Sequence, residues 1–476
     1  MRVAFYTLGC KLNQSESEAL ASSFKSRGFF VRRHDEDAEI FIVNTCTVTS
    51  KAEQKARRII RHLARSNPES VIIVTGCYAQ LNAADIRELA PNVLTLGHDR
   101  KYQLLELADC LKATGKVLTE DDHPPLRTVN ETVRSCLDTL TDTPADTHGI
   151  FRFDPETYSF HSRAFLKIQD GCDHQCAYCR VRLARGASVS LSPDQVLERA
   201  AHLADRGYRE IVLTGVNLTA YRDPADRFFG LPRLLELLTS VPGEYRIRLT
   251  SLEPEMISDK LLQAVSHPRI CPHFHIPVQS GSDRILKAVY RPYTADKIRR
   301  AVAGLRKVKK DPFLAADVIA GLPGEAEEDF EASRSLIEEL GFAALHVFPF
   351  SPRPGTELYH AKQHVPERIA GERAALLREL ALRLHDEYAQ RWIGTEVTVL
   401  PEEIREIKGE KYWSGLSENY LRVELPFEQV SRWVSEFSGS GVNAAGDQTG
   451  VRGSLLPVRI RKVEDERVFG EIAELE

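Results

Sequence analysis

The sequence lacks the long apolar stretches, the repeats and the strong net charge that mark several classes of protein. No segment approaches the ~18 consecutive uncharged apolar residues that a membrane helix requires. No motif recurs at a period of about 20 to 50 residues. The 63 Lys and Arg residues nearly balance the 68 Asp and Glu residues, which leaves a net charge of −5. This balance excludes a bulk polycation but leaves room for a local basic patch.

The start of the chain also lacks the pattern of an export signal. Its first strand-like run leads directly into Gly9, Cys10 and Lys11, without an apolar signal core. We therefore expect a cytoplasmic protein with no membrane partner.

The composition that remains is that of an ordinary globular protein. The 476 residues are 42% hydrophobic and 28% charged. At about 150 residues per domain this length predicts roughly three domains. We predict an α/β protein divided into residues 1–117, 118–160, 161–392 and 393–476.

The first segment, 1–117, is predicted to be a parallel α/β domain, because strand-like and helix-like runs alternate along it. The strand-like runs are 2–7, 39–43, 71–75 and 92–96. Residues 118–160 are rich in Asp, Thr and Pro and show no sustained period, so we expect a linker there.

The third segment, 161–392, is predicted to be a partial (β/α)6 barrel of the TIM type, in which chemistry belongs at the C-terminal ends of the strands. Six strand-like runs alternate with helical ones, at 164–169, 210–214, 246–250, 273–277, 313–319 and 344–348. The last segment, 393–476, has strand-like runs at 396–400, 420–424 and 456–460, one helical run at 428–436 and a Gly/Ser-rich loop at 438–454. A small β-barrel is the natural interpretation.

The nine cysteines are an odd number in a chain without an export signal. This argues against a disulfide framework and for reduced, reactive or metal-binding thiols. Three of them lack a distinctive context. We interpret Cys110 and Cys271 as small buried hydrophobic residues and Cys136 as a linker residue.

Three cysteines, hereafter the loop cysteines, follow the first barrel strand with C-x₃-C-x₂-C spacing: Cys172, Cys176 and Cys179. Soft thiolates select iron–sulfur clusters or zinc. Three thiolates hold three irons of a cubane and leave its fourth iron free for another ligand. The alternative is a zinc site with a distant fourth ligand such as His174.

Three further cysteines, hereafter the N-domain cysteines, each lie two or three residues after a predicted strand: Cys10, Cys46 and Cys77. The ends of successive strands in a parallel sheet open onto one crevice, so these thiols should converge. A second three-thiolate cluster is the interpretation we favour. The alternative is chance placement of buried core cysteines, which are common.

The motifs around both sets of cysteines resemble those of the radical S-adenosylmethionine methylthiotransferases, over nearly the whole chain. The matching runs are TLGCKLNQ at 7–14, NTCTVT at 44–49, GCYAQ at 76–80, LTGVNL at 213–218, SLEP at 251–254, PVQSGS at 277–282 and GLPGE at 321–325. The run SENYLRV at 417–423 resembles the family's TRAM domain. One departure is Arg182, which stands where the family usually has a proline.

The resemblance is strongest to the branch of the family that modifies N6-threonylcarbamoyladenosine beside the anticodon of tRNA. It implies that a methylthio group is added at C2 of that adenine, with tRNA as partner. It also implies two 4Fe-4S clusters, one on each cysteine set, and S-adenosylmethionine as cofactor. An electron donor is required as well, and the sequence does not identify it. Two cofactor molecules are consumed, one to methylate a sulfur at the N-domain cluster and one to generate a radical. Two alternatives remain, a methylthiotransferase for an aspartate of a small-subunit ribosomal protein and a non-enzymatic zinc protein that binds RNA.

The resemblance also suggests cofactor-binding residues in the barrel: Tyr178, Gly215, Asn217, Glu253 and Gly321. Each of the last four has a structural alternative. Glycines after strands often serve only a tight turn. Asn217 and Glu253 equally suit the capping of the next helix.

For RNA binding, the predicted helix after Cys46 carries cations at 3–4 spacing, which places them on one face. We take Lys51, Lys55, Arg58 and Arg65 as phosphate-binding candidates. The alternative is an ordinary solvated face. Residues 297–310 form a second basic segment. The last domain nets 10 − 16 = −6, so RNA binding there would need a local patch such as Arg459, Arg461 and Lys462.

Overall fold

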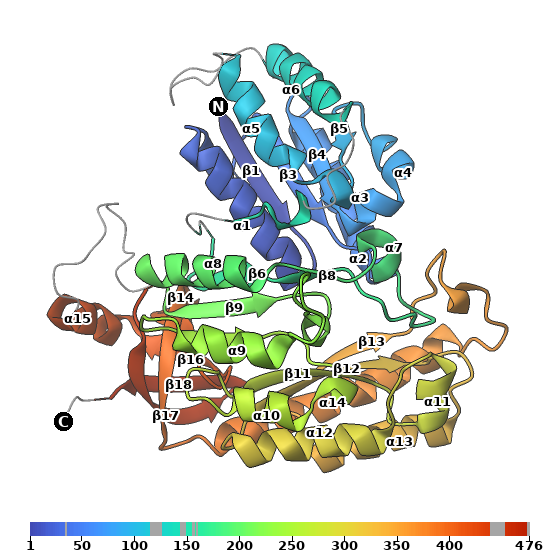
Figure 1. The fold of residues 1–476 in the computed structure, drawn as a ribbon, viewed down its shortest axis with the longest axis vertical. Coiled ribbons are helices and arrows are strands. Elements are labelled where there is room, and N and C mark those ends of the chain that lie inside the picture. Colours follow the sequence, from blue (N-terminus) through green and yellow to red (C-terminus); the bar gives the residue numbers. More distant parts are fainter. Residues whose placement is uncertain are drawn as a thin grey trace.

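The computed structural model describes residues 1–33, 36–114, 126–142, 149–154, 158, 160–437 and 453–473. The chain forms three packed units (Figure 1): an N-terminal sheet with its helices, an open barrel below it, and a small closed barrel against the open one. The predicted mixed α/β architecture with parallel sheets is confirmed.

The N-terminal unit is a five-stranded parallel sheet in the order β2-β1-β3-β4-β5. Every residue of β3 and β4 is buried, as expected for central strands covered by helices on both faces. The strand β2 was not predicted. The strands are β1 (Arg2–Thr7), β2 (Phe30–Arg33), β3 (Ile40–Thr45), β4 (Val71–Gly76) and β5 (Val93–Thr95). The helices are α1 (Lys11–Ser26), α2 (Ser50–Ser66), α3 (Cys77–Leu81), α4 (Ala83–Arg87), η1 (His98–Arg100) and α5 (Gln103–Ala113).

Residues within the expected linker form a helix instead, α6 (Leu126–Thr141), followed by η2 (Gly149–Phe151). The expectation of an irregular segment is wrong there. Val129, Val133 and Leu137 recur every four residues and pack into the core of the N-terminal unit. The many Thr, Ser and Asn residues on the other positions hid this apolar stripe in the sequence.

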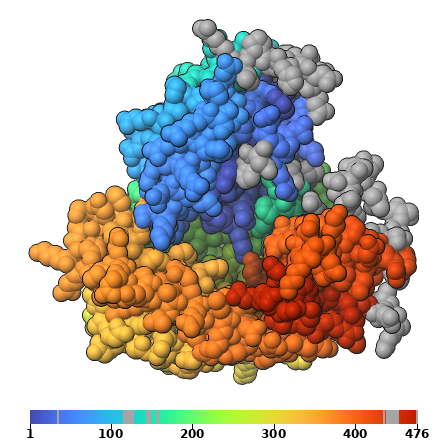
Figure 2. Space-filling view, turned by 180° about the vertical axis from the view of Figure 1, so that it is seen from behind, coloured from blue at the N-terminus to red at the C-terminus, as the bar shows by residue number. Residues whose placement is uncertain are grey.

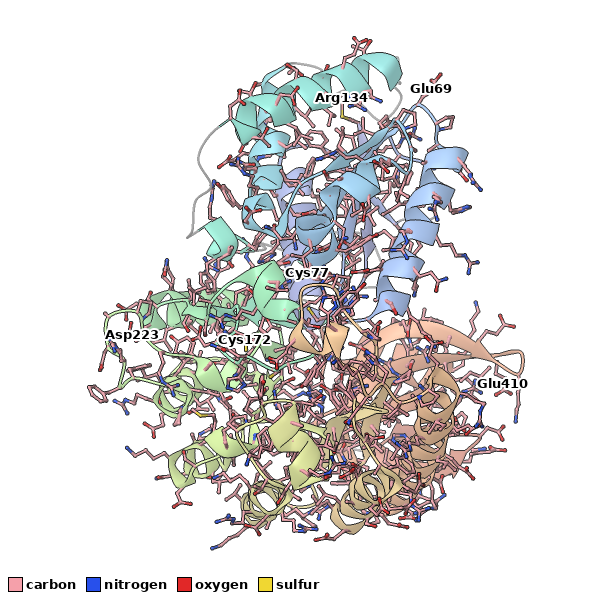
Figure 3. All side chains as sticks on the ribbon, turned by 90° about the vertical axis from the view of Figure 1, so that its right-hand side faces the viewer. Glu69, Cys77, Arg134, Cys172, Asp223 and Glu410 are labelled. Atoms are coloured by element: carbon pink, nitrogen blue, oxygen red, sulfur yellow. A yellow bond between two sulfur atoms is a disulfide. The ribbon has the colours of Figure 1, made fainter. Side chains whose placement is uncertain are left out.

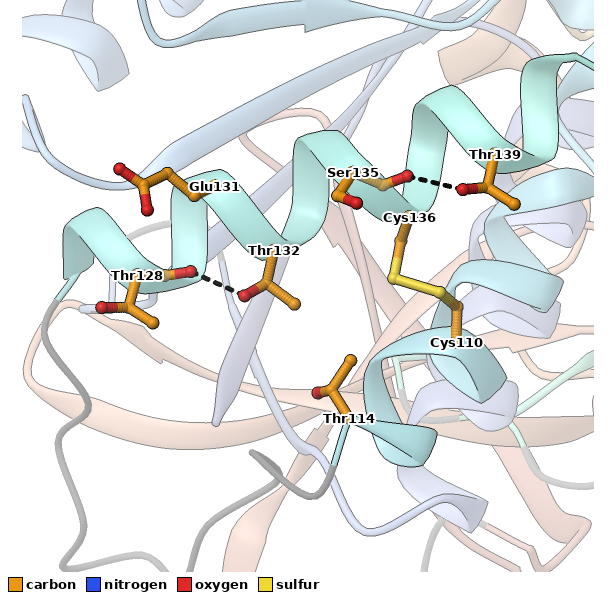
Figure 4. Close-up of a pocket in the computed structure, with 8 residues that line it drawn as sticks. All are labelled: Cys110, Thr114, Thr128, Glu131, Thr132, Ser135, Cys136 and Thr139. Carbon is orange, nitrogen blue, oxygen red and sulfur yellow. Dashed lines mark hydrogen bonds between the residues drawn. A yellow bond between two sulfur atoms is a disulfide. The ribbon is translucent and has the colours of Figure 1, made fainter.

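The same helix corrects the interpretation of two cysteines. Cys136 of α6 forms a disulfide with Cys110 of α5 (Figure 4). The interpretation of Cys110 as a small buried hydrophobic residue and that of Cys136 as a linker residue are therefore both wrong. Spacing could not reveal this pair, because the helix that carries Cys136 was not expected. Cys271 is buried, as expected.

The central unit consists of two three-stranded parallel sheets, β10-β9-β6 and β11-β12-β13, with β6 and β13 as outer strands. Isolated bridges such as Ser251 to His275 join β10 to β11, so the six strands curve into a partial barrel. The strands are β6 (Ala164–Lys167), β9 (Glu210–Thr214), β10 (Arg246–Leu249), β11 (His273–Gln279), β12 (Phe313–Ala320) and β13 (Ala344–Pro349), with a short pair β7 (Gln169–Asp170) and β8 (Val189–Ser190). The helices are α7 (Val181–Arg185), α8 (Pro193–Asp205), η3 (Leu218–Ala220), α9 (Leu231–Ser240), η4 (Pro254–Met256), α10 (Asp259–Val265), α11 (Asp283–Ala288), α12 (Ala295–Val308), α13 (Glu327–Leu340), η5 (Glu357–His360) and α14 (Glu367–Gln390).

The C-terminal unit is a closed barrel in the order β14-β15-β16-β18-β17. Its strands are β14 (Glu396–Ile407), β15 (Glu410–Ser417), β16 (Arg422–Pro426), β17 (Leu456–Glu464) and β18 (Arg467–Ile472), with α15 (Phe427–Phe437) after β16. The predicted small β-barrel is present, with β15 and β18 in addition to the three expected strands. Most of the expected Gly/Ser-rich loop, 438–452, lies outside the described residues.

Seen from behind, the three units surround a hollow (Figure 2). The blue N-terminal unit, the orange end of the open barrel and the red C-terminal unit form its walls, and green barrel residues lie at its floor. Within the described residues, no helix combines the length and the apolar character needed to cross a bilayer.

Candidate active site

The N-domain cysteines lie at the carboxyl ends of β1, β3 and β4, which are neighbours in the sheet. Gly9 and Gly76 precede two of them with φ of +101° and +95°. A Cβ atom on Gly9 would lie 2.6 Å from the Cys46 Cβ, and one on Gly76 would lie 2.4 Å from the Thr45 carbonyl oxygen. Only glycine permits both this backbone conformation and this close approach. The fold therefore brings Cys10, Cys46 and Cys77 to one edge of the sheet.

The loop cysteines lie between β7 and α7, on a loop held by backbone hydrogen bonds. The Cys172 amide donates to the Gly186 carbonyl (3.1 Å), and the Cys179 amide donates to the Cys176 carbonyl (3.0 Å). Gly171 starts the loop with φ +67°, where a Cβ atom would lie 1.9 Å from the Ala187 carbonyl oxygen. The loop thus has a defined shape in the protein alone.

Each set contains buried thiols that resist ionisation in the protein alone. Burial raises the pKa of Cys46 and of Cys179 to about 12, and thiolates of the same set raise it further. Burial also raises the pKa of Cys77, although Arg185 opposes the shift. A metal that binds here must displace the thiol protons, so binding of the metal stabilises the ionised form of each set.

Zinc and an iron–sulfur cluster require different spacings of the thiols that bind them. Tetrahedral zinc at Zn–S distances of ~2.3 Å holds its sulfurs about 3.8 Å apart. In the described part of the chain, three clusters of His, Asp and Glu side chains have ligand atoms within 4.8 Å of one another, and none contains a cysteine. In the protein alone, at least two of the three thiols of each set therefore lie more than 4.8 Å apart. A cubane binds each thiolate through a different iron, and so fits a wider triangle.

Arg185 of α7 connects the open barrel to the N-terminal unit directly beside the N-domain cysteines. Its Nε donates to Cys77 Sγ (3.2 Å), its Nη2 donates to Asn13 Oδ1 (2.7 Å), and its Nη1 donates to Asp170 Oδ2 (2.9 Å) and Glu16 Oε1 (3.2 Å). Asp170 and Glu16 are fully buried, and Arg185 with neighbouring cations lowers the pKa of both, against the effect of burial. Arg185 was not among the expected site residues, because its partners come from three separate segments: α1, Cys77 at the start of α3, and Asp170 of β7.

A second ionic bridge crosses the same junction at Glu53, a buried residue of α2. Arg180, the residue after Cys179, donates to Glu53 Oε1 (3.0 Å), and Arg353 donates to the same oxygen. Thr47, the residue after Cys46, also donates to it (2.5 Å). Figure 3 shows Cys77 and Cys172 on the two sides of this junction. Residues adjacent to one cysteine of each set are thus tied to one carboxylate.

Glu253 lies next to the loop cysteines through Arg291, which donates from Nη2 to Glu253 Oε2 and from Nη1 to Cys176 Sγ (3.1 Å). Burial, with Glu255 and Asp317 nearby, raises the pKa of Glu253 to about 7 despite Arg291. Tyr178 packs against an apolar cluster that includes Val289. The barrel therefore holds an ionisable carboxylate and a cation beside the thiols.

The other expected cofactor residues have clear structural roles. Asn217 Oδ1 accepts hydrogen bonds from the Ala220 amide (3.2 Å) and from Thr219 Oγ1 (2.6 Å), and so caps η3. Gly321 has φ +79°, and a Cβ atom there would lie 2.4 Å from the Ala370 Cβ. A Cβ atom on Gly215 would lie 2.7 Å from Gln169 Oε1. The structural alternatives hold for these positions, and cofactor contact remains a prediction.

The predicted RNA-binding cations of α2 all lie on the surface. Thr49, three residues after Cys46, caps this helix by accepting a hydrogen bond from the Ala52 amide (3.1 Å), and α2 begins at the next residue. We call Lys51, Lys55, Arg58 and Arg65 the basic face. All four are exposed, and none forms an ion pair with a residue that the structure describes.

The other two basic candidates contain cations that are paired with carboxylates. In α12, Arg299 pairs with Glu339 (2.8 Å) and Arg300 pairs with Asp296 (2.5 Å). In the C-terminal unit, each of the three expected cations pairs with a glutamate: Arg459 with Glu396, Arg461 with Glu471 and Lys462 with Glu464. Of the three patches, the basic face is therefore the one in which none of the named cations forms an ion pair within the described residues.

Comparison with known proteins identifies the family. The family model described as Uncharacterized protein family UPF0004 matches residues 2–97, and that of the Radical SAM superfamily matches residues 166–337. Three proteins named threonylcarbamoyladenosine tRNA methylthiotransferase MtaB are similar over most of their length. The protein from Treponema pallidum is 40% identical, and the match covers 89% of this chain and 94% of that protein. The protein from Thermotoga maritima is 36% identical, with 94% of this chain and 95% of that protein covered. The protein from Bacillus subtilis is 35% identical, with 88% of this chain and 89% of that protein covered. The chain therefore belongs to the MtaB family of radical S-adenosylmethionine methylthiotransferases and is an enzyme.

Proposed function

We propose that this enzyme adds a methylthio group to C2 of N6-threonylcarbamoyladenosine next to the anticodon of tRNA. The names of its relatives, which match at 31–40% identity along most of the chain, support this substrate. The observation that carries the chemistry is the pair of three-cysteine sets on two sides of one junction, tied together through Arg185 and Glu53. Membership of an enzyme family argues against the alternative of a non-enzymatic zinc protein.

In this proposal the loop cysteines hold one 4Fe-4S cluster and the N-domain cysteines hold a second. S-adenosylmethionine would bind at the loop cluster, beside Glu253 and Arg291. When bound, these groups would supply the one-electron chemistry and the methylthio group. tRNA and an electron donor are the implied partners.

The protein's own residues hold the two cysteine sets in a fixed arrangement. Arg185 donates a hydrogen bond to the sulfur of Cys77, and Arg291 donates one to the sulfur of Cys176. The Arg180–Glu53–Arg353 bridge is buried and connects the two units, which fixes the separation of the two cysteine sets. Two reactions that share one substrate need such a fixed separation.

The test is a deletion strain whose tRNA is digested to nucleosides and analysed by mass spectrometry. We expect the 2-methylthio form of N6-threonylcarbamoyladenosine to disappear and the unmethylthiolated nucleoside to accumulate. The wild-type gene should restore it, and a gene encoding Cys176→Ala should not. Persistence of the methylthiolated nucleoside, or loss of a methylthio group from a small-subunit ribosomal protein in the same strain, would contradict the proposed substrate.

A further inference from the structure

A polar interior extends from the loop cysteines along the inner face of the open barrel. His275 Nε2 lies 3.0 Å from Asp317 Oδ1, and its Nδ1 lies 2.7 Å from Ser251 Oγ. The His346 ring lies 5.5 Å from the His275 ring. These side chains come from β11, β12 and β13 and from the residues after β10. The same interior contains Glu253 at one end, because Asp317 contributes to its electrostatic surroundings.

At the other end, the C-terminal unit inserts Tyr420 into this interior. The residue has a left-handed backbone, with φ +66°, between β15 and β16. Its ring stacks on His273 with centroids 4.0 Å apart and meets Phe313 edge-on at 5.6 Å. Lys11 of the N-terminal unit also contacts this ring. The N-terminal unit, the open barrel and the C-terminal unit therefore meet at Tyr420.

Lys11 is the residue after Cys10, and its Nζ lies 5.3 Å from the centre of the Tyr420 ring. The guanidinium of Arg248 lies 5.0 Å from the same ring. Arg248 has a carboxylate partner, because its Nε pairs with Glu210 (2.6 Å) and its other nitrogens donate to Glu210 and to backbone carbonyls. Arg163, also nearby, pairs with Glu402 (2.7 Å).

Lys11 differs from these arginines because it has no carboxylate partner among the described residues. It is partly buried, with two further cations close by. A cation held among cations at such a site is unfavourable unless an anion joins it. Its position beside Cys10 places that anion next to the N-domain cysteines, where the proposed reaction delivers its group.

We infer that the Lys11 ammonium binds the carboxylate of the threonylcarbamoyl group on the substrate adenine. This inference rests on the proposed function and names the contact that recognises the substituent. An unmodified adenosine has no anion at N6 and would leave Lys11 uncompensated. The other anion that RNA offers is a backbone phosphate, which every tRNA carries whether or not the base is modified.

The test measures binding of anticodon stem-loops to the anaerobically reconstituted protein. Three RNAs of one sequence carry N6-threonylcarbamoyladenosine, its methyl ester or unmodified adenosine, so that their phosphates are identical. A charged hydrogen bond is worth roughly 10- to 100-fold in affinity. Wild-type protein should prefer the free acid over the methyl ester by roughly this factor. Lys11→Met should bind both RNAs equally, and Lys11→Arg should keep part of the preference.

The control variant is Lys25→Met, which removes the same charge from the exposed far end of α1, roughly 21 Å away along the helix. It should bind like the wild type. Iron content and thermal unfolding of each variant report whether Lys11→Met still folds and carries its clusters. If it does not, the wild-type ratio between acid and ester and the Lys11→Arg variant decide the question.

The outcomes separate the inference from the proposed function. Equal wild-type affinity for all three RNAs contradicts both. A wild-type preference for the modified base that is the same for acid and ester contradicts only the inference. An acid preference that persists in Lys11→Met also contradicts it, and loss of affinity by the same factor for all three RNAs assigns Lys11 to a phosphate.

Discussion

Neutralising the basic face of α2 tests where tRNA binds. The variant replaces Lys51, Lys55, Arg58 and Arg65 by Gln. All four side chains are exposed and free of ion pairs within the described structure, so the change removes four positive charges without breaking a contact of the fold. The helix begins four residues after Cys46, so these charges extend away from the proposed site.

The expected size follows from counterion release. Each phosphate contact contributes roughly 0.7–0.9 to the slope of log affinity against log salt. Four lost contacts therefore reduce the slope by roughly 2.8–3.6. Between about 50 and 200 mM salt, the ratio of wild-type to variant affinity should fall by roughly 50- to 150-fold. The loss should be similar for all substrate tRNAs, because phosphate contacts carry no base information.

The assay is a set of binding curves at several salt concentrations, with a variant of equal charge change as control. That control replaces four cations of α12, where two are already paired with carboxylates: Lys297, Arg299, Arg300 and Lys307. It should leave the slope unchanged. Cleavage of S-adenosylmethionine without tRNA should be unaffected in both variants.

An unchanged slope in the α2 variant would refute the assignment and leave the basic face as solvated surface. A slope that falls only in the α12 variant would move the RNA to that helix. Equal reductions in both would show a general effect of net charge rather than a binding surface.

The remaining predictions concern the junction and the thiols. Ala variants of the loop cysteines should lose reductive cleavage of S-adenosylmethionine, whereas Ala variants of the N-domain cysteines should keep cleavage and lose methylthiolation; cleavage that survives without a loop cysteine contradicts the assignment. Arg185→Met leaves buried Glu16 and Asp170 without a main partner and should lower the free energy of unfolding by about 3–5 kcal/mol. Calorimetry should show a lower Tm for this variant than for the control Arg182→Met, which changes an exposed residue. Equal Tm values for the two variants would refute this. Because burial raises the pKa of Glu253 to about 7, its carboxylate is present above this pH and lost below it. Affinity for S-adenosylmethionine should therefore fall between about pH 8 and about pH 6 in the wild type and stay flat in Glu253→Gln; a flat wild-type profile would show that Glu253 does not bind the cofactor.

Local patterns in the chain were sufficient to predict most strands and both cysteine sets. Strand runs of apolar residues followed directly by cysteine, as at Cys46 and Cys77, fix both the element and the edge of the sheet where the thiol lies, because parallel strands end on one side. The exposure of the basic face likewise followed from helical spacing alone. Where polar residues dominated the surface of a helix, as in α6, the same reasoning failed. Val129, Val133 and Leu137 are too few to stand out among Thr, Ser and Asn, and so the disulfide from Cys136 was missed as well.

Tertiary structure alone decided which charges matter. Arg185, Glu53 and Lys11 carry no local signal, because the partners that define them come from other units of the fold. Arg185 and Glu53 are compensated across the junction, whereas Lys11 meets cations and a tyrosine ring. The interaction energy of a buried charge depends on its distance from other charges, which here lie on segments remote in sequence. These distances are set only when the sheets, the open barrel and Tyr420 have packed together.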